Sequence, residues 1–398
     1  MGQRTALRQR ILVAVVQVLA LATWFSASVV VPSLQVEWGI SLSAAVWLTA
    51  STQIGFVVGA VASALTNLAD RFHAPRLLGA SAAGAATCTA LLALLADSMA
   101  SAVPLRFLTG VCLAGVYPVG MKLMASWAPT GIRGTWFGVL IGALALGSNL
   151  PHVIRILDLP WRSVLLAAAG VTLVGALVCV TSVRTGPHVD SRRPRLDPRY
   201  VTRMFRDPAQ RLVNIGYFGH MWELYALWTW FSAFVLAGTA AGGADPGLVS
   251  LGVFVAMGAA GLVGCLVGGW SADRVGRAPT AIVALSVSGA CSLLSPLFFL
   301  APWGLLLGFA VVWGASVIAD SGVFSTMLSE VAESAYAGTA LTAQTAIGFL
   351  LTVVTIQAVP VAAGLLGWQW AFLVLVPGPV VGVAALARTQ RHRRVQAA

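Results

Sequence analysis

Residues 268–279 read "GGWSADRVGRAP", and residues 66–75 read "TNLADRFHAP". Each string places an Asp-Arg pair between two long apolar stretches of the chain, followed by Arg277 in one string and His73 in the other. Asp273 lies 203 residues after Asp70, which is about half of the 398-residue length. A repeat at this spacing is typical of a duplicated unit, so we expect two halves that have the same organisation.

The composition indicates an integral membrane protein. Hydrophobic residues make up 58% of the chain, and charged residues only 9%. A soluble domain carries about 25% charged residues, so this chain could not cover itself with a water-facing surface. The five cysteines lie in apolar stretches and lack the spacing of metal ligands. The sequence therefore predicts a chain that faces lipid and has neither a metal site nor a cofactor.

Twelve segments are long and apolar enough to cross a bilayer, which takes roughly 20 residues. The predicted fold is all-α, with twelve transmembrane helices in two pseudo-symmetric six-helix bundles. The expected domains are an N-terminal bundle at 1–183, a cytoplasmic basic linker at 184–211 and a C-terminal bundle at 212–398. The predicted spans are 11–33, 43–69, 74–98, 101–127, 134–157, 162–183, 212–238, 247–271, 279–301, 303–328, 336–361 and 368–387.

Most basic residues fall on one side of the predicted membrane. Of the 24 lysines and arginines, 21 lie toward that side, in the termini, the linker, the loops or, for Lys122, near the inner end of a span, and only Arg106, Arg155 and Arg162 do not. Because basic residues accumulate on the cytoplasmic side, we expect both termini in the cytoplasm and the protein in the cytoplasmic membrane. The net charge of +11 then faces membrane lipid, which disfavours a nucleic-acid partner.

These features together resemble the major facilitator superfamily of secondary transporters, over essentially the whole chain. The second loop, Gly269 to Arg277, matches the family signature G-x-x-x-D-R-x-G-R. The first loop departs from it, because Thr66 and His73 stand where the signature has glycine. The string "RFLTG" at 106–110 is similar to the family's fourth-helix motif.

By this resemblance, the two loops are expected to act as gates between the halves. Asp70 would face the start of the eleventh span near Ala335, and Asp273 the start of the fifth near Gly134. A helix N-terminus favours an anion, and each contact would have to break when the transporter changes state. The expected gating residues are Asp70, Arg71 and Arg76 in the first loop and Gly269, Asp273, Arg274, Gly276 and Arg277 in the second.

Ionisable residues inside spans are costly, so they are candidates for a substrate or proton pathway. Glu223 lies near the middle of the seventh span, with His220 one turn earlier on nearly the same face. Because burial disfavours a charged carboxylate, these two side chains could share a proton. The alternative for Glu223 is a structural hydrogen bond to a neighbouring helix. Trp222, Trp228 and Trp230 surround Glu223 and could stack on a planar solute.

Four further residues complete the predicted pathway. Asp320 in the tenth span is either a transport residue or a helix-packing group. Arg106 in the fourth span is a carboxylate or proton partner, or else a structural arginine. Lys122, the single lysine, contacts the substrate or extends toward the lipid headgroups. Tyr117 in the same span is also included.

The sequence thus predicts a secondary active transporter that works by alternating access. It predicts no enzyme, because the histidines are few and dispersed. ATP-driven transport is excluded because no "GxxxxGK[ST]" string occurs. We expect a monomeric proton symporter, with a small organic or inorganic anion as the favoured substrate. The alternatives are a proton-driven exporter of an aromatic or amphipathic compound and an uncoupled facilitator.

Overall fold

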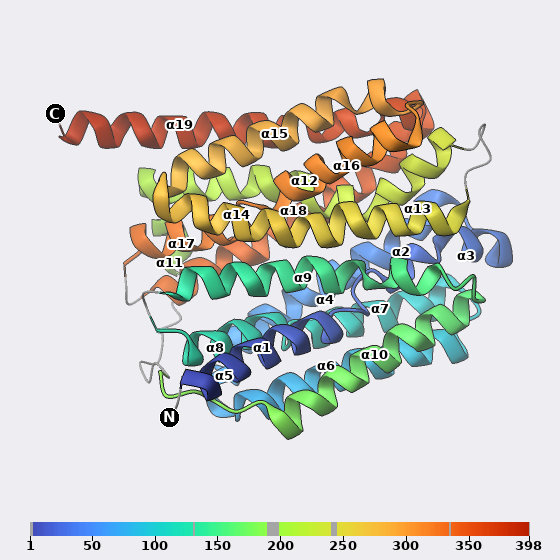
Figure 1. Ribbon diagram of the computed structural model, residues 1–398, viewed down its shortest axis with the longest axis horizontal. Helices are drawn as coiled ribbons and strands as arrows, with labels where there is room; N and C mark the ends of the chain where they lie inside the picture. Colours follow the sequence, from blue (N-terminus) through green and yellow to red (C-terminus); the bar gives the residue numbers. More distant parts are fainter. Residues whose placement is uncertain (1–2, 130–131, 189–198, 240–244, 334–335, 398) are drawn as a thin grey trace.

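The computed structural model describes residues 3–129, 132–188, 199–239, 245–333 and 336–397. These residues form a bundle of long helices that run along a common axis (Figure 1). Both chain termini lie at the same end of this bundle, which we call the termini end. No strand occurs in the described residues, and this confirms the all-α fold.

The first half of the chain forms helices in the order that was predicted for its six spans. Three helices make up an interrupted first span, two make up the fourth, and a short helix lies in the loop after the second. The helices are α1 (Gln3–Ala20), α2 (Ser26–Val29), α3 (Val31–Trp38), α4 (Leu42–Leu65), α5 (Leu68–Arg71), α6 (Ala74–Leu95), α7 (Met99–Leu113), α8 (Tyr117–Trp127), α9 (Arg133–Arg155) and α10 (Trp161–Ser182).

The second half repeats this order after a short helix in the linker. Its second span contains a π-helical turn, its fourth is again divided in two, and its last begins with a 3₁₀ segment. The elements are α11 (Arg199–Arg206), α12 (Pro208–Thr239), α13 (Pro246–Val253), η3 (Phe254–Ala259), α14 (Ala260–Arg274), α15 (Arg277–Phe298), α16 (Trp303–Ile318), α17 (Ser321–Val331), α18 (Ala337–Leu366), η4 (Trp368–Leu375) and α19 (Pro377–Ala397).

Ten helical stretches among the described residues are long and apolar enough to cross a membrane, and each overlaps a predicted span. The predicted spans 11–33 and 212–238 are not among them. The first is interrupted after Ala20, and the second lies in α12, which is long enough but carries polar residues such as His220 and Glu223.

Among Pro118, Pro151 and Pro360, which all lie inside predicted spans, one proline coincides with a break in a helix. Pro118 lies in the first turn of α8, where its missing amide hydrogen costs nothing, so a new helix begins there after the break that follows α7. Pro151 and Pro360 lie inside α9 and α18, and both helices continue past them.

The two halves meet along two equivalent pairs of helices. α4 packs against α18, and α9 packs against α14 and η3. Because α14 is the duplicate of α4 and α18 is the duplicate of α9, these pairs are related by the internal repeat. This is the contact pattern that a pseudo-twofold axis along the membrane normal produces. The domain boundaries at 183 and 212 themselves remain a prediction.

Gly55 allows α4 and α7 to approach closely. A Cβ atom at this position would lie 2.0 Å from the backbone oxygen of Phe107. We therefore expect Gly55→Val to destabilise the protein by roughly 3 kcal/mol, because neither backbone can move without disturbing its neighbours. Gly170 faces open space, so Gly170→Val is the matched control. Thermal unfolding in detergent measures both variants, and equal melting temperatures would contradict the close approach.

Candidate functional site

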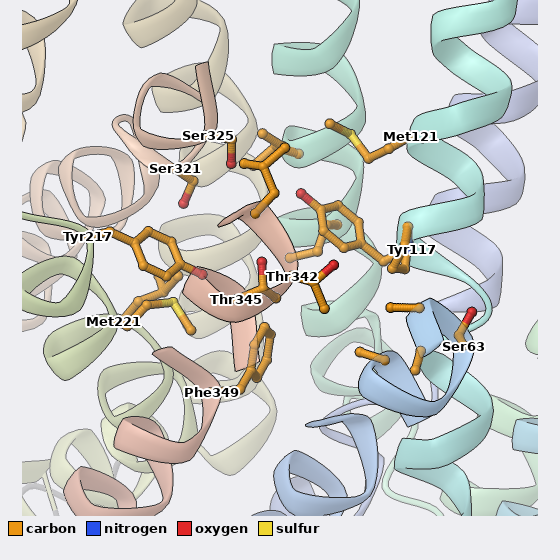
Figure 2. Close-up of a pocket in the computed structure, with 18 of the residues that line it drawn as sticks. Ser63, Tyr117, Met121, Tyr217, Met221, Ser321, Ser325, Thr342, Thr345 and Phe349 are labelled. Atoms are coloured by element: carbon orange, nitrogen blue, oxygen red, sulfur yellow. The ribbon is translucent and has the colours of Figure 1, made fainter. Parts of the chain in front are cut away.

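A cavity of about 370 Å³ lies between the two halves (Figure 2). It is lined mainly by α4, α8 and α9 of the first half and by α12, α17 and α18 of the second. At the termini end, Asn67 and Gly338 line it from opposite halves. Pockets that bind small molecules have volumes of about 300–1,000 Å³, so a small solute fits here.

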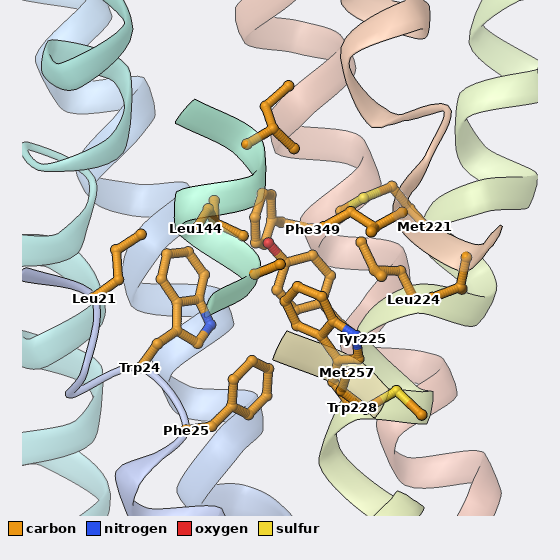
Figure 3. Close-up of a cluster of buried hydrophobic side chains, with 14 of the residues drawn as sticks. Leu21, Trp24, Phe25, Leu144, Met221, Leu224, Tyr225, Trp228, Met257 and Phe349 are labelled. Carbon is orange, nitrogen blue, oxygen red and sulfur yellow. The ribbon is translucent and has the colours of Figure 1, made fainter. Parts of the chain in front are cut away.

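A cluster of six aromatic side chains closes the deep end of this cavity (Figure 3). The rings of Phe56 and Phe349 lie 4.4 Å apart, and those of Trp24 and Tyr225 lie 5.9 Å apart, so the cluster joins the halves. Tyr225 and Phe349 also line the cavity. The cavity therefore extends from the cluster toward the termini end. The members are Trp24, Phe25, Phe56, Tyr225, Trp228 and Phe349.

The two walls of the cavity differ in chemistry. The second half supplies most of the polar side chains, namely Tyr217, His220, Tyr225, Ser321, Ser325, Thr342 and Thr345. The first half supplies mainly apolar ones, namely Ala60, Ala64, Ala114, Pro118, Met121, Ile141 and Leu144, together with Ser63, Asn67 and Tyr117. Within the described residues, the lining contains neither arginine nor lysine. A bound solute would find most of the hydrogen-bonding groups on the second-half side and apolar residues on both sides.

His220 connects the cavity to a buried acid. Its Nδ1 atom lies 2.8 Å from Oδ1 of Asp320, and its Nε2 atom lies 2.8 Å from the hydroxyl of Ser321. His220 and Asp320 are each 1% exposed, whereas Ser321 is half-buried in the cavity wall. The three side chains form a path from the cavity to the carboxylate. An imidazole in this position can exchange a proton with the cavity while the carboxylate balances its charge.

Among the described residues, the hydrogen-bond partners of Glu223 do not include His220, the proton-sharing partner that the sequence suggested. The hydroxyls of Ser288 and Ser292 donate to its carboxylate at 2.8 and 2.7 Å, and Nε1 of Trp313 donates at 2.8 Å. These residues belong to α15 and α16, so the fully buried Glu223 ties α12 to two helices of its own half. It is not a lining residue of the cavity. The partner of His220 is Asp320 rather than Glu223, because the two side chains leave α12 toward different helices.

Arg106 is a structural arginine in this fold. It donates to the backbone oxygens of Leu48 at 3.1 Å, Thr23 at 3.0 Å and Trp24, and it is fully buried. The break after α1 deprives carbonyl groups of their helical partners, and the guanidinium replaces those partners. Arg106 does not line the cavity, so its contacts here are those of the structural alternative, and a contact with a solute or proton stays a prediction.

Two of the tryptophans near Glu223 also serve packing. Nε1 of Trp222 donates to the backbone oxygen of Val374 at 2.9 Å, and Nε1 of Trp230 donates to that of Ile356 at 2.8 Å. Neither ring lines the cavity, so the cavity gives no support to stacking of a solute on Trp222 or Trp230. Trp228 belongs to the aromatic cluster.

The two remaining pathway residues of the fourth span have different positions. Tyr117 lines the cavity, and its role on a substrate pathway stays a prediction. Lys122 is half-buried and is not a lining residue. Its predicted contact with the substrate therefore has no support from the cavity.

Asp273 reaches the first half as the resemblance implied. A Cβ atom at Gly134 would lie 3.7 and 3.8 Å from its two carboxylate oxygens, which places the carboxylate at the first turn of α9. Free amide groups and the helix dipole favour an anion there. Gly269 and Arg277 line the same inter-half space, which has a volume of about 430 Å³.

The other basic residues of the second loop have their own partners. Arg277 forms an ion pair with Glu330, and the guanidinium of Arg274 lies over the ring of Trp270 at 4.8 Å. Gly276 has a φ of +106°, a value that side chains disfavour. The second copy of the loop therefore requires glycine at this position.

The first loop is built differently. His73, the counterpart of Gly276, has a φ of −62° and needs no glycine, while Asn67 takes the left-handed conformation at +51°. Arg71 and Arg76 are exposed. The side chain of Asp70 and residue Ala335 lie outside the described part of the structure, so their predicted contact remains a prediction.

Sequence reasoning missed the hydroxyl groups of the second-half wall. Ser321 and Ser325 lie four residues apart on α17, and Thr342 and Thr345 lie three apart on α18. Such spacings place side chains on one helix face, so the sequence could have predicted that each pair lies on a common polar face. What the sequence does not reveal is that both faces, together with Tyr217 of α12, meet at one cavity.

A helical membrane bundle with a solute-sized cavity between two equivalent halves defines a transport protein. The model of the Major Facilitator Superfamily matches residues 13–356, and the chain belongs to this superfamily. It is therefore a multi-pass membrane transporter that binds a small molecule, and not an enzyme.

Comparisons with individual proteins place it within that family only broadly. The fold is similar to the proton:xylose symporter XylE bound to 6-bromo-6-deoxy-D-glucose, with a TM-score of 0.71, 14% identity and 96% of each chain covered. It is also similar to a bacterial homolog of the human lysosomal transporter Spinster in an inward-facing, unoccupied conformation, with a TM-score of 0.70, 13% identity and coverage of 98% of this chain and 96% of that one. A gallate transporter of Pseudomonas putida is 28% identical over 141 residues, which span 35% of this chain and 31% of that transporter.

Proposed function

We propose that this protein moves a small organic acid, most suitably an aromatic one, across the cytoplasmic membrane together with protons. The observation that carries the proposal is the cavity itself. It combines an apolar wall, a wall of hydroxyl groups and the His220–Asp320 pair at its edge. Such a site can bury a ring, bind polar substituents and exchange a proton in one place.

The lining favours an organic acid over an inorganic anion. Phosphate and sulfate are bound best by arginine or lysine, and the described lining contains neither. An organic acid instead buries its hydrocarbon part on the apolar wall, and it needs no cation when it carries its own proton. The partial similarity to a gallate transporter supports the same class, because gallate is an aromatic acid.

The His220–Asp320 pair is the proposed site of proton coupling. Ser321 links the imidazole to the cavity, and the neighbouring titratable groups are Tyr217, whose ring lies 6.1 Å away, Glu223 and Cys265. A proton that the pair takes up from the cavity adds one positive charge to this edge of the cavity. Binding of an acid next to this pair would therefore be linked to its protonation.

The proposed orientation has both termini in the cytoplasm, as the distribution of basic residues indicates. The cavity extends toward the termini end, so it would communicate with the cytoplasm in this state. The halves at 1–183 and 212–398 would tilt about the cavity, with the chain working as a monomer. The Asp273 contact with α9 would form and break during this movement.

Transport by proteoliposomes tests the proposal. With an acidic exterior, we expect radiolabelled hydroxybenzoate to accumulate about tenfold over vesicles without a pH gradient, since one pH unit supplies a tenfold driving force per coupled proton. A protonophore should abolish the accumulation, and phosphate should not accumulate. Uptake that is the same with and without the gradient would show an uncoupled facilitator, and the absence of any organic-acid uptake would contradict the proposal.

Export of an amphipathic compound is the alternative that the apolar first-half wall favours. The same vesicles distinguish the two functions by the direction of coupling. An exporter that exchanges its cargo for protons would accumulate that cargo when the vesicle interior, rather than the exterior, is acidic. Symport requires the opposite gradient.

A further inference from the structure

Two tyrosines face one another across the cavity. Tyr117 comes from α8 of the first half and Tyr217 from α12 of the second. Figure 2 shows their rings on opposite sides of the pocket, with both phenol oxygens directed toward its middle. We propose that these tyrosines form a clamp that selects a flat ring with hydrogen-bonding groups at opposite edges, as in a hydroxylated aromatic acid. This inference rests on the proposed transport of an organic acid.

The ring of Tyr217 is held rigidly in the second-half wall. It packs against the rings of His220 at 6.1 Å and Phe324 at 6.0 Å. On its other side, Gly348 of α18 lies so near that a Cβ atom there would be 2.5 Å from Cε1 of Tyr217. Its phenol oxygen is therefore fixed beside Thr345, near the His220–Ser321 pair. We assign the acid group of the substrate to this end of the clamp.

The hydroxyl of Tyr117 stands on the wall that is otherwise apolar at this depth. Among the described residues it has no hydrogen-bond partner, and the same holds for the side-chain hydroxyls of Ser325 and Thr342. Polar groups at a binding site find partners in water or in a ligand. A hydroxyl at the far edge of a bound ring would supply the partner of Tyr117.

Apolar side chains line the same cavity as the two phenol groups. Met121, Ile141 and Leu144 line the first-half side, while Met221 and Leu224 line the second-half side. Methionine sulfur and branched carbons make favourable contacts with an aromatic ring. The cavity thus offers a phenol group on each side and apolar side chains among its lining, which fits a ring better than a sugar with hydroxyls on every face.

The clamp predicts strong discrimination between ring acids. A site built to bind a substrate hydroxyl rejects the analogue that lacks it, because a polar group of the site is then left unpaired. We expect kcat/KM for uptake of 4-hydroxybenzoate to be about tenfold higher than that of unsubstituted benzoate. Benzoate cannot form the hydrogen bond of the hydroxyl, and one such bond accounts for a difference of this size. Calorimetric titration of the purified protein should show the same ratio in binding, independently of transport.

Single substitutions separate the two ends of the clamp. Tyr117→Phe should lower kcat/KM for 4-hydroxybenzoate about tenfold and so bring the ratio of the two acids near one. Tyr217→Phe should lower kcat/KM for both acids by the same factor, because both carry the carboxyl group. The ratio of their kcat/KM values should therefore stay at the wild-type value. Tyr336→Phe is the matched control, since this ring stacks on Tyr200 at 4.7 Å outside the cavity lining, and it should keep the wild-type ratio.

The outcomes distinguish this inference from the proposed function. If Tyr117→Phe binds and transports with the wild-type ratio, the clamp is overturned while organic-acid transport stands. If calorimetry shows that the wild-type protein binds benzoate more tightly than 4-hydroxybenzoate, the clamp is overturned as well. If the wild-type protein neither binds nor transports any ring acid under either gradient, the proposed function itself fails.

Discussion

Asp320→Asn is expected to reduce proton-driven accumulation of the substrate about 100-fold, because removing one partner of a buried charged pair costs roughly 3 kcal/mol or more. The carboxylate lies 2.8 Å from Nδ1 of His220, and an asparagine cannot balance the charge of a protonated imidazole. Exchange of labelled for unlabelled substrate should continue, since it needs no net release of a proton. Proteoliposome uptake with and without a pH gradient measures the first effect, and exchange measures the second.

Glu223→Gln provides the contrasting variant. The carboxylate of Glu223 accepts three hydrogen bonds from Ser288, Ser292 and Trp313, so we expect a loss of stability, with transport that still depends on the pH gradient. If Glu223→Gln abolishes this dependence while Asp320→Asn keeps it, then Glu223 carries the coupling proton and the assignment to Asp320 is wrong.

Arg106→Met should destabilise the protein by roughly 3–5 kcal/mol, because it leaves buried carbonyl groups of the interrupted first span without partners. Arg106→Lys should recover only part of this loss, since an ammonium group cannot reach Thr23, Trp24 and Leu48 with the spread of a guanidinium. Thermal unfolding in detergent measures the series.

Arg155→Met is the matched control for this series. Arg155 donates a single hydrogen bond to Ser33 at 3.3 Å, so its loss should cost about 1 kcal/mol or less. If Arg106→Met and Arg155→Met unfold at the same temperature, the structural role assigned to Arg106 is contradicted.

The repeat and the hydropathy of the chain predict the architecture well, because both are local properties of the sequence. The copied loop strings indicated the positions of the two equivalent loops, and the expected position of Asp273 near Gly134 at the start of α9 matches the structure. The Gly55 contact between α4 and α7 is likewise readable, since a small residue four positions before another marks a close helix approach.

The site was less predictable because its contacts join distant parts of the chain. His220 and Glu223 are neighbours on α12, yet their partners lie on different helices. Glu223 accepts hydrogen bonds from residues up to 90 positions away, whereas His220 contacts Asp320 and Ser321 at the start of α17. Helix spacing gives the face of a residue but not the helix that packs against it. The break after Ala20 contains neither proline nor glycine, and its carbonyl groups accept hydrogen bonds from the distant Arg106 as well as from nearby residues such as Ser26.

Substrate protection of a cavity cysteine tests the central claim, that the solute binds between the two halves, most directly. Thr342→Cys, in a chain whose five native cysteines are replaced by alanine, would be alkylated by a water-soluble maleimide in proteoliposomes. Ser329→Cys, which is exposed outside the cavity lining, serves as the control. The account predicts that 4-hydroxybenzoate slows labelling of Thr342→Cys alone, with half-protection at the concentration that half-saturates uptake. Unchanged labelling at a concentration that saturates uptake would contradict it.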